Sequence, residues 1–385
     1  MISNKRIFGC LNIFKNQPTF NSQTEQAYSH KDRQLFLLSF SDHHQRYTEQ
    51  TKKTKKLYPF SISNNTTHQA LLIPMAQKQP LIVRDKNQMR NWSRSMRSQS
   101  KLIAFVPTMG YLHQGHLSLI TEAHKHANVV AVSIYVNPGQ FSPNEDLSTY
   151  PSDFEGDVQK LLSVPGGVDV VFNPKNLYDY GESEGGEGGG GGGGGEVVSC
   201  VEKSGLGHES WVRVEKLEKG LCGKSRPVFF RGVATIVAKL FNIVEPDVAV
   251  FGKKDYQQWR VIQRMVRDLD FSIKVIGCEI TRENDGLAMS SRNVHLSSEE
   301  REKALSINKS LSRAKSAAED GQIQCEKLRN LVIQCITDAG GRIDYAEIVD
   351  QQSLEKVELI KSPVVFCVAA LFGKVRLIDN MEINL

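Results

Sequence analysis

The chain has 385 residues, 40% hydrophobic and 24% charged, a composition typical of globular proteins long enough for two domains. No apolar run approaches the ~20 residues that a membrane-spanning helix needs, so we expect no membrane-embedded function. The formal net charge is +5, but residues 1–74 hold ten Lys or Arg and four Asp or Glu, which leaves −1 for residues 75–385. A nearly neutral body with a basic tail lacks the electrostatic footprint of nucleic-acid binding, so we expect no nucleic-acid partner.

Residues 1–74 are rich in Ser, Asn, Gln, Thr and Lys and show little periodicity, which predicts a disordered N-terminal extension. Their low acidity also fits an organelle transit peptide, although no convincing amphipathic helix is present. Met75 opens a more protein-like stretch and is a candidate second start. A dispensable tail and a targeting segment both remain open. The seven cysteines are odd in number and form no C-x-x-C, which favours reduced thiols and a cytoplasmic location over disulfides or zinc.

A strand–helix–strand pattern follows at residues 102–136. Residues 102–106 form a continuous apolar run, as in a strand buried on both faces, and residues 129–136 form another. Residues 115–127 between them have the periodicity of an amphipathic helix. The pattern predicts a parallel, right-handed βαβ unit.

A glycine run at 188–195, flanked by glutamates, interrupts this pattern. It cannot bury enough apolar surface to offset the entropy of ordering it, so we expect a mobile surface insert at 181–209. Phosphate binding by these glycines is disfavoured, because phosphate-binding loops space their glycines for specific turns.

The regular pattern resumes at Trp211. We expect helices at 232–244 and 255–269, the second with an inward face ending at Leu269, and strands at 248–251 and 273–280. A Ser297-x-x-Glu300 capping box opens a further helix, and strands are expected at 343–349, 364–371 and 375–378. The fold class predicted is α/β: a Rossmann-like nucleotidyltransferase domain with a parallel sheet at 75–285, followed by a smaller α+β domain at 286–385.

The first motif that carries chemistry is Pro107-Thr108-Met109-Gly110, followed by His113-x-Gly115-His116 at a helix start. Backbone N–H groups and the positive helix end favour a phosphate there, and two imidazoles three residues apart can donate to it. Gly110 and Gly115 would let the backbone approach a nucleotide closely. A zinc site or incidental surface histidines are the alternatives, but no third ligand and no H-E-x-x-H is evident.

Three further motifs stand near strand ends. Asp285 to Asn293 offers the Ser290 and Ser291 hydroxyls and the permanent charge of Arg292, which together suit a clamp on a triphosphate. In the second, Gly252-Lys253-Lys254-Asp255, a lysine can reach phosphate, and Gln258 lies one turn later. In the third, Asn137 and Gln140 can hydrogen-bond a small polar substrate. Each motif alone also fits a solvated loop, a helix start or a simple turn. Their convergence on one crevice indicates nucleotidyl transfer without identifying the acceptor.

These motifs together resemble the pantothenate synthetase (pantoate–β-alanine ligase) family, and the resemblance runs from about Leu81 to the C-terminus, interrupted by the insert. The matching stretches include V-P-T-M-G-x-L-H-x-G-H, V-S-I-x-V-N-P-x-Q-F, E-D-L-x-x-Y-P, F-G-x-K-D-x-Q-Q and D-G-L-A-M-S-S-R-N. The glycine-rich insert and the Cys222-Gly-Lys-Ser-Arg stretch resemble the plant branch. The resemblance implies that ATP adenylates pantoate with Mg²⁺ present, that β-alanine then displaces AMP to give pantothenate, and that the enzyme is a homodimer.

The resemblance also implies roles for individual residues. His116 and His113 would act on the phosphates, with His116 as the candidate proton donor, and Gln140 and Gln258 would hold pantoate. Thr281 would make a backbone contact to adenine, and Asp157 lies where family acids approach the metal. The ATP site would comprise Pro107, Thr108, Met109, Gly110, His113, His116, Gly252, Lys253, Lys254, Asp255, Thr281, Met289, Ser290, Ser291 and Arg292.

Departures from the family pattern and two other functions also bear on the prediction. Lys253 replaces a glutamate common in bacterial members, and Phe229 stands where they often carry histidine. A different nucleotidylyltransferase would share the histidines but would not need Gln140 and Gln258 together. A non-catalytic ATP-binding regulator predicts loss of the histidines or of the Ser-Ser-Arg loop, and the sequence retains both.

Overall fold

The computed structural model describes residues 78–178, 198–205 and 207–385. The predicted disordered extension at 1–74, the alternative start at Met75 and the glycine run at 188–195 lie outside the described residues. In the described part of the chain, no helix has the length and apolarity that crossing a membrane requires.

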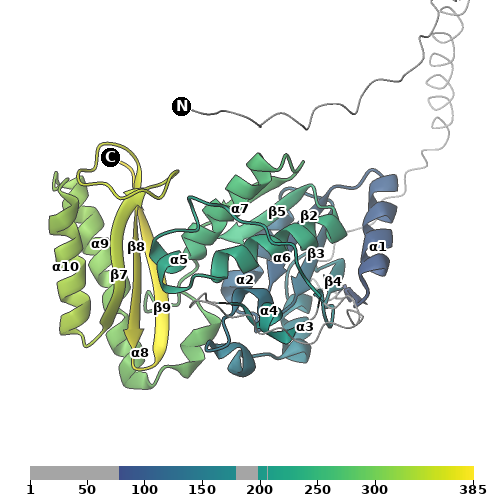
Figure 1. The fold of residues 1–385 in the computed structure, drawn as a ribbon, viewed down its shortest axis with the longest axis horizontal. Helices are drawn as coiled ribbons and strands as arrows, with labels where there is room; N and C mark the ends of the chain where they lie inside the picture. Colours follow the sequence, from purple (N-terminus) through teal and green to yellow (C-terminus); the bar gives the residue numbers. More distant parts are fainter. Residues whose placement is uncertain (1–77, 179–197, 206) are drawn as a thin grey trace, which may run out of the picture. The chain divides into compact units, whose positions relative to one another are not determined.

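Six parallel strands form the larger sheet, in the order β1-β4-β3-β2-β5-β6 (Figure 1). The direction of winding reverses at β2, because β3 and β4 follow on one side of it and β5 and β6 on the other. In open parallel sheets, ligands bind at the carboxyl ends of the strands beside such a reversal. The strands are β1 (Leu81–Val83), β2 (Ile103–Thr108), β3 (Val129–Ile134), β4 (Val170–Phe172), β5 (Val248–Gly252) and β6 (Lys274–Cys278).

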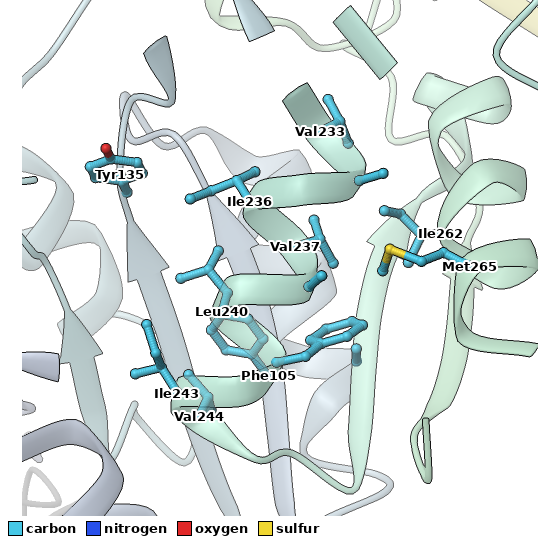
Figure 2. Packing of buried hydrophobic residues seen from close by; sticks show 14 of the residues in the cluster. Phe105, Tyr135, Val233, Ile236, Val237, Leu240, Ile243, Val244, Ile262 and Met265 are labelled. Atoms are coloured by element: carbon cyan, nitrogen blue, oxygen red, sulfur yellow. The ribbon is translucent and has the colours of Figure 1, made fainter. Parts of the chain in front are cut away.

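Helices cover both faces of this sheet, as the near-continuous apolar strands require. Alternate residues of β2 point to opposite faces: Phe105 packs with α6 and meets Phe241 edge-on at 6.5 Å, whereas Val106 packs with α2. Figure 2 shows Phe105 beneath the apolar stripe of α6, beside Ile262 and Met265 of α7. The helices are α1 (Lys86–Ser98), α6 (Phe229–Val244) and α7 (Tyr256–Asp268) on one face, and α2 (Gln114–Ala123) and α3 (Phe154–Leu162) on the other.

A smaller antiparallel sheet follows, in the order β7-β8-β9, with helices packed on one face. The predicted capping box is confirmed, since Glu300 N donates to Ser297 Oγ at 3.2 Å and Ser297 N to Glu300 Oε2 at 2.8 Å. The two sheets together confirm the predicted fold class, whereas the domain boundary at 285/286 stays a prediction. The elements are α8 (Ser298–Ala304), α9 (Ser306–Glu319), α10 (Cys325–Asp338), β7 (Arg342–Asp350), β8 (Val364–Phe372) and β9 (Val375–Ile383).

Short elements connect the larger ones, and one of them corrects a prediction. Helix α4 lies inside the segment predicted to be a mobile insert, 181–209. A Ser199–Glu202 capping box starts α4, and Val201 is buried in the core, so the predicted insert extends too far at its C-terminal end. The short elements are α4 (Cys200–Ser204), α5 (Leu221–Ser225) and the 3₁₀ helices η1 (Pro138–Gln140), η2 (Asp146–Thr149), η3 (Lys253–Asp255) and η4 (Ser291–His295).

Other differences concern where elements end. Helix α2 ends at Ala123 rather than near Ala127, and α7 ends at Asp268, which leaves Leu269 53% exposed instead of facing inward. Strand β9 continues to Ile383, well past the predicted end at Ile378. Strand β9 stays paired with β8 as far as Ile383, and local hydrophobicity does not reveal such a long-range pairing.

Candidate functional site

One cavity of about 250 Å³ opens at the carboxyl ends of β2, β3 and β5. It gathers all the residues predicted for the site except Gly110, Lys253 and Asp157. The predicted residues that line it are Pro107, Thr108, Met109, His113, His116, Asn137, Gln140, Gly252, Lys254, Asp255, Gln258, Thr281, Met289, Ser290, Ser291 and Arg292. The four motifs therefore converge as predicted.

The two histidines start helix α2 by capping each other. Gly115 N donates to His113 Nδ1 at 3.1 Å, and His113 N donates to His116 Nδ1 at 3.2 Å. Since each Nδ1 accepts a backbone proton, the neutral ring carries its own proton on Nε2. The rings lie 4.1 Å apart between centroids. Two Nε2–H donors are thus fixed side by side in the cavity.

Burial lowers the pKa of His113 to about 4 and that of His116 to about 3. The ring of His113 lowers the pKa of His116 further, and the Lys254 ammonium lowers both. At neutral pH the pair is uncharged. It can therefore serve as a pair of neutral hydrogen-bond donors, while the positive charge in the cavity comes from lysine and arginine side chains.

The turn before the histidines is held by Asp157. Asp157 is fully buried in α3, and its carboxylate accepts from Tyr111 N at 2.7 Å and Leu112 N at 2.6 Å. Burial raises its pKa, which these two backbone donors partly offset. Asp157 does not line the cavity and supports the turn, and its assignment to a metal stays a prediction.

The two glycines of the first motif lie in different surroundings. Gly110 has φ +86°, where only glycine is unstrained, and lies outside the cavity lining. A Cβ on Gly115 would lie 2.9 Å from the His113 ring. Gly110 therefore serves the turn, whereas Gly115 makes room for the His113 ring and also lines the cavity.

The adjacent lysines at the end of β5 separate into two roles. Lys254 lines the cavity, with Nζ 4.0 Å from Asp255 Oδ2. Lys253 lies outside the lining, and its Nζ binds Glu279 at 2.5 Å and Glu382 at 3.0 Å. Burial alone would lower the pKa of Lys253, but the two carboxylates raise it overall. The Lys253 side chain is thus engaged in an ion-pair network, and its assignment to ATP stays a prediction.

The two amide side chains that follow β3, those of Asn137 and Gln140, have different surroundings. Asn137, 1% exposed, donates through Nδ2 to Gln140 Oε1 at 2.9 Å and to Gly232 O at 3.2 Å, and its Oδ1 accepts from Tyr178 Oη at 2.7 Å. Asn137 thus orients Gln140, and its own contact with a substrate stays a prediction. The Gln140 Nε2 group meets only the weak acceptor Met109 Sδ, at 3.3 Å, within the described residues. The Gln140 amide is therefore the available donor.

The Ser-Ser-Arg loop is fastened to η2. Arg292 donates through Nε and Nη2 to the two carboxylate oxygens of Asp146, at 3.0 and 3.1 Å, and Ser291 Oγ lies 3.3 Å from Tyr150 Oη. Burial raises the pKa of Tyr150, which therefore stays a neutral phenol. Sequence reasoning missed Asp146 and Tyr150, although both stand in the quoted E-D-L-x-x-Y-P stretch.

The sequence also did not indicate that the remaining wall of the cavity belongs to the site. The apolar stripe of α6, predicted as core, lines one side of the cavity with Val233, Ile236, Val237 and Leu240. Figure 2 shows these four side chains along α6, with Tyr135 directly after the end of β3. Arg226 also lines the cavity, stacked 4.0 Å over the Phe229 ring and bound to Glu145. An apolar wall beside cations suits a small acid with a hydrocarbon body.

These features define a class of protein: a Rossmann-like enzyme that handles phosphate at the switch point of a parallel sheet. Residues 81–382 match the family model described as pantoate-beta-alanine ligase. A pantoate–beta-alanine ligase from Lotus japonicus is 78% identical over 307 residues, covering 80% of this chain and 99% of that protein. One from Arabidopsis thaliana is 67% identical over 306 residues, with the same coverage. The chain belongs to the pantoate–β-alanine ligase family.

Solved structures agree with this membership. Pantothenate synthetase from Thermus thermophilus has a TM-score of 0.67 and 36% identity, covering 79% of this chain and 100% of that one. The pantoate-beta-alanine ligase from Francisella tularensis, complexed with beta-gamma ATP and beta-alanine, has a TM-score of 0.59 and 33% identity, covering 78% and 97%.

Proposed function

We propose that the protein condenses pantoate with β-alanine at the expense of ATP, releasing pantothenate, AMP and pyrophosphate. One observation carries the proposal: a single cavity joins the neutral histidine pair, Lys254 and the Ser-Ser-Arg loop to the Gln140 amide and the apolar wall of α6. The Francisella relative, complexed with an ATP compound and β-alanine, supports the same pair of substrates. Family membership supports pantoate as the acid.

The first step forms pantoyl adenylate. A pantoate carboxylate oxygen attacks the α-phosphorus of ATP, and the bond to the pyrophosphate oxygen breaks, so the electron pair leaves with pyrophosphate. The carboxylate is already ionised near neutral pH and needs no general base. The protein's contribution is therefore alignment and charge stabilisation. His113 and His116 donate Nε2–H to phosphate oxygens, and Lys254 supplies the nearby positive charge.

The second step forms the amide. The uncharged amine of β-alanine attacks the acyl carbon, a C–N bond forms, the C–O bond breaks so that its electron pair leaves with AMP, and the amine's proton passes to solvent. Gln140, held by Asn137, lies where its Nε2–H₂ donor can orient the pantoyl group. Arg226 and Arg376 also line the cavity and offer cations for the β-alanine carboxylate.

Mg²⁺ enters the proposal with the nucleotide. The carboxylates lining the cavity are Asp255 and Glu279, and Glu279 is paired with Lys253. In the ranges that the structure describes, no cluster of three His, Cys, Asp or Glu could hold a metal ion. One carboxylate plus phosphate oxygens nevertheless fits Mg²⁺, so Asp255, 44% exposed, would hold it. When bound, the ion neutralises part of the triphosphate charge.

Incubation with ATP, Mg²⁺, pantoate and β-alanine tests the proposal, with each substrate omitted in turn. Pantoate-dependent exchange of labelled pyrophosphate into ATP, without β-alanine, is expected for the adenylate. AMP and pantothenate should then form in equal amounts once β-alanine is added. Absence of pantoate-dependent exchange together with absence of pantothenate would reject the function.

A homodimer and a cytoplasmic location complete the proposal, with organelle targeting through residues 1–74 as the alternative. Sedimentation equilibrium should give twice the 43.1 kDa of one chain. Removal of residues 1–74 should leave activity intact, because the family match begins at Leu81. A fluorescent fusion to residues 1–74, compared with the full chain, decides between the two locations.

A further inference from the structure

Strand β9 reaches from the small sheet to the turn that carries Lys254. Asn380, 5% exposed, donates through Nδ2 to the carbonyl oxygens of Lys253 at 2.9 Å and Lys254 at 3.0 Å. An amide nitrogen has two protons, so this side chain has committed both to consecutive carbonyl groups of one turn.

Strand β9 also holds the side chains of Lys253, which precedes Lys254, and of Tyr256, which follows it by two residues. Glu382 accepts from Lys253 Nζ at 3.0 Å and from Tyr256 Oη at 3.1 Å. Tyr256 is buried, at 3% exposed. Strand β9 therefore fixes the backbone of the turn and the side chains of Lys253 and Tyr256. Lys254 itself lines the cavity.

Local capping does not explain the conformation of this turn. Asp255, which precedes α7, makes no side-chain cap hydrogen bond, and Gly252, which precedes η3, has no side chain to make one. Helix starts normally rely on such caps to specify the direction in which the chain enters. Here the contacts from β9 hold the carbonyl groups of the turn, not the N–H groups that a cap would bind.

A second contact from β9 fixes the opposite lip of the cavity. Asp379, 4% exposed, pairs with Arg282 at 2.7 and 2.9 Å, and Arg282 also donates to Gly286 O at 3.2 Å. Arg282 follows Thr281 directly and precedes the loop of Ser290 to Arg292. Two consecutive residues of β9, Asp379 and Asn380, thus hold two of the segments proposed to contact ATP.

We propose that Asn380 is a positioning residue for ATP, which aims the Lys254 ammonium at the phosphates by holding the carbonyl groups of its turn. The proposal rests on the proposed phosphate role of Lys254. It assigns to the C-terminal sheet a direct part in nucleotide affinity, beyond support of the fold.

Asn380→Ala in the full chain tests this, with KM measured for each substrate. The KM for ATP should rise about tenfold, the loss expected for one or two hydrogen bonds, while the KM values for pantoate and β-alanine stay within twofold. Asn380→Asp, which keeps the volume but removes the donor, should do the same and serves if the alanine variant does not fold. Ile348→Ala, a buried change in the same sheet, should lower Tm without a selective effect on ATP.

A double-mutant cycle with Lys254→Ala shows whether Asn380 acts through the lysine. In the Lys254→Ala background, Asn380→Ala should add less than a twofold change in the KM for ATP. Additive effects, or equal rises in all three KM values, would overturn the positioning role while leaving the proposed function intact. An unchanged KM for ATP in Lys254→Ala alone would overturn both the lysine's proposed role and this inference.

Discussion

His113 and His116 form a reciprocal cap at the start of α2, each accepting a backbone N–H through Nδ1. Ser297 and Glu300 perform the same task at α8 with a hydroxyl and a carboxylate. The histidine version leaves an Nε2–H on each ring for another partner. One pair of side chains thus starts the helix and presents two donors to the cavity.

Replacing one of these donors should reduce adenylation more than it alters the fold. His116→Ala is expected to lower the rate of pantoate-dependent pyrophosphate exchange by ~10²–10³, the range for losing one donor to a developing charge. His126→Ala is the matched control, since His126 follows the other end of α2 and binds Glu122. A His116→Ala enzyme that keeps the wild-type exchange rate would remove the histidine from the mechanism.

The low pKa values of the pair predict acid-sensitive stability. The folded values, about 4 for His113 and about 3 for His116, lie below the ordinary 6.5, so the unfolded chain binds more protons under acid conditions. The stabilisation is complete above pH 6.5 and is lost as pH falls from 6.5 toward 4 and 3. Each histidine should lower the free energy of unfolding by about 1 kcal/mol at pH 5.5 relative to pH 7.5.

Urea unfolding at the two pH values measures this loss. His113→Asn keeps a good N-cap residue but does not titrate, so its loss of stability between pH 7.5 and 5.5 should be smaller by about 1 kcal/mol. An identical loss in the variant and the wild type would show that His113 is not held neutral.

Asp157 is expected to matter for stability rather than for metal binding. Asp157→Ala leaves the N–H groups of Tyr111 and Leu112 without their acceptor, which should cost about 2–4 kcal/mol of unfolding free energy. Asp153→Ala, which removes only the cap of α3, should cost about 1 kcal/mol. The Mg²⁺ concentration for half-maximal activity should stay within twofold in Asp157→Asn. A large increase in that concentration would restore Asp157 to the metal site.

The two adjacent lysines provide a matched comparison. Lys254→Ala should raise the KM for ATP at least tenfold, because a charge beside the phosphates is lost. Lys253→Ala should leave that KM within threefold and instead lower Tm, because Glu382 loses an ion-pair partner. KM and Tm measured on both variants decide the assignment. The opposite pattern would return Lys253 to the nucleotide site.

Sequence patterns predicted much of the fold because its strands are buried. Strands β2, β3 and β5 are short apolar runs, and the helix after β2 has the periodicity of an amphipathic helix. The parallel βαβ unit therefore follows from the local sequence. The same argument predicted which motifs meet, since carboxyl ends of parallel strands share one edge. The extension of β9 past Ile378 was not predictable, because its polar residues are paired by β8 and not by their own pattern.

The sequence alone determined the types of group at this site: two histidines, a lysine turn, two amides and a Ser-Ser-Arg loop, together with the family they match. Only the tertiary structure decided what each group does. Asn137, Asp157 and Lys253 have side chains suited to ligands, yet their donors or acceptors are engaged within the protein. A hydrogen-bonding group is available to a substrate only when no partner from a distant segment occupies it, and such long-range contacts are absent from any local pattern.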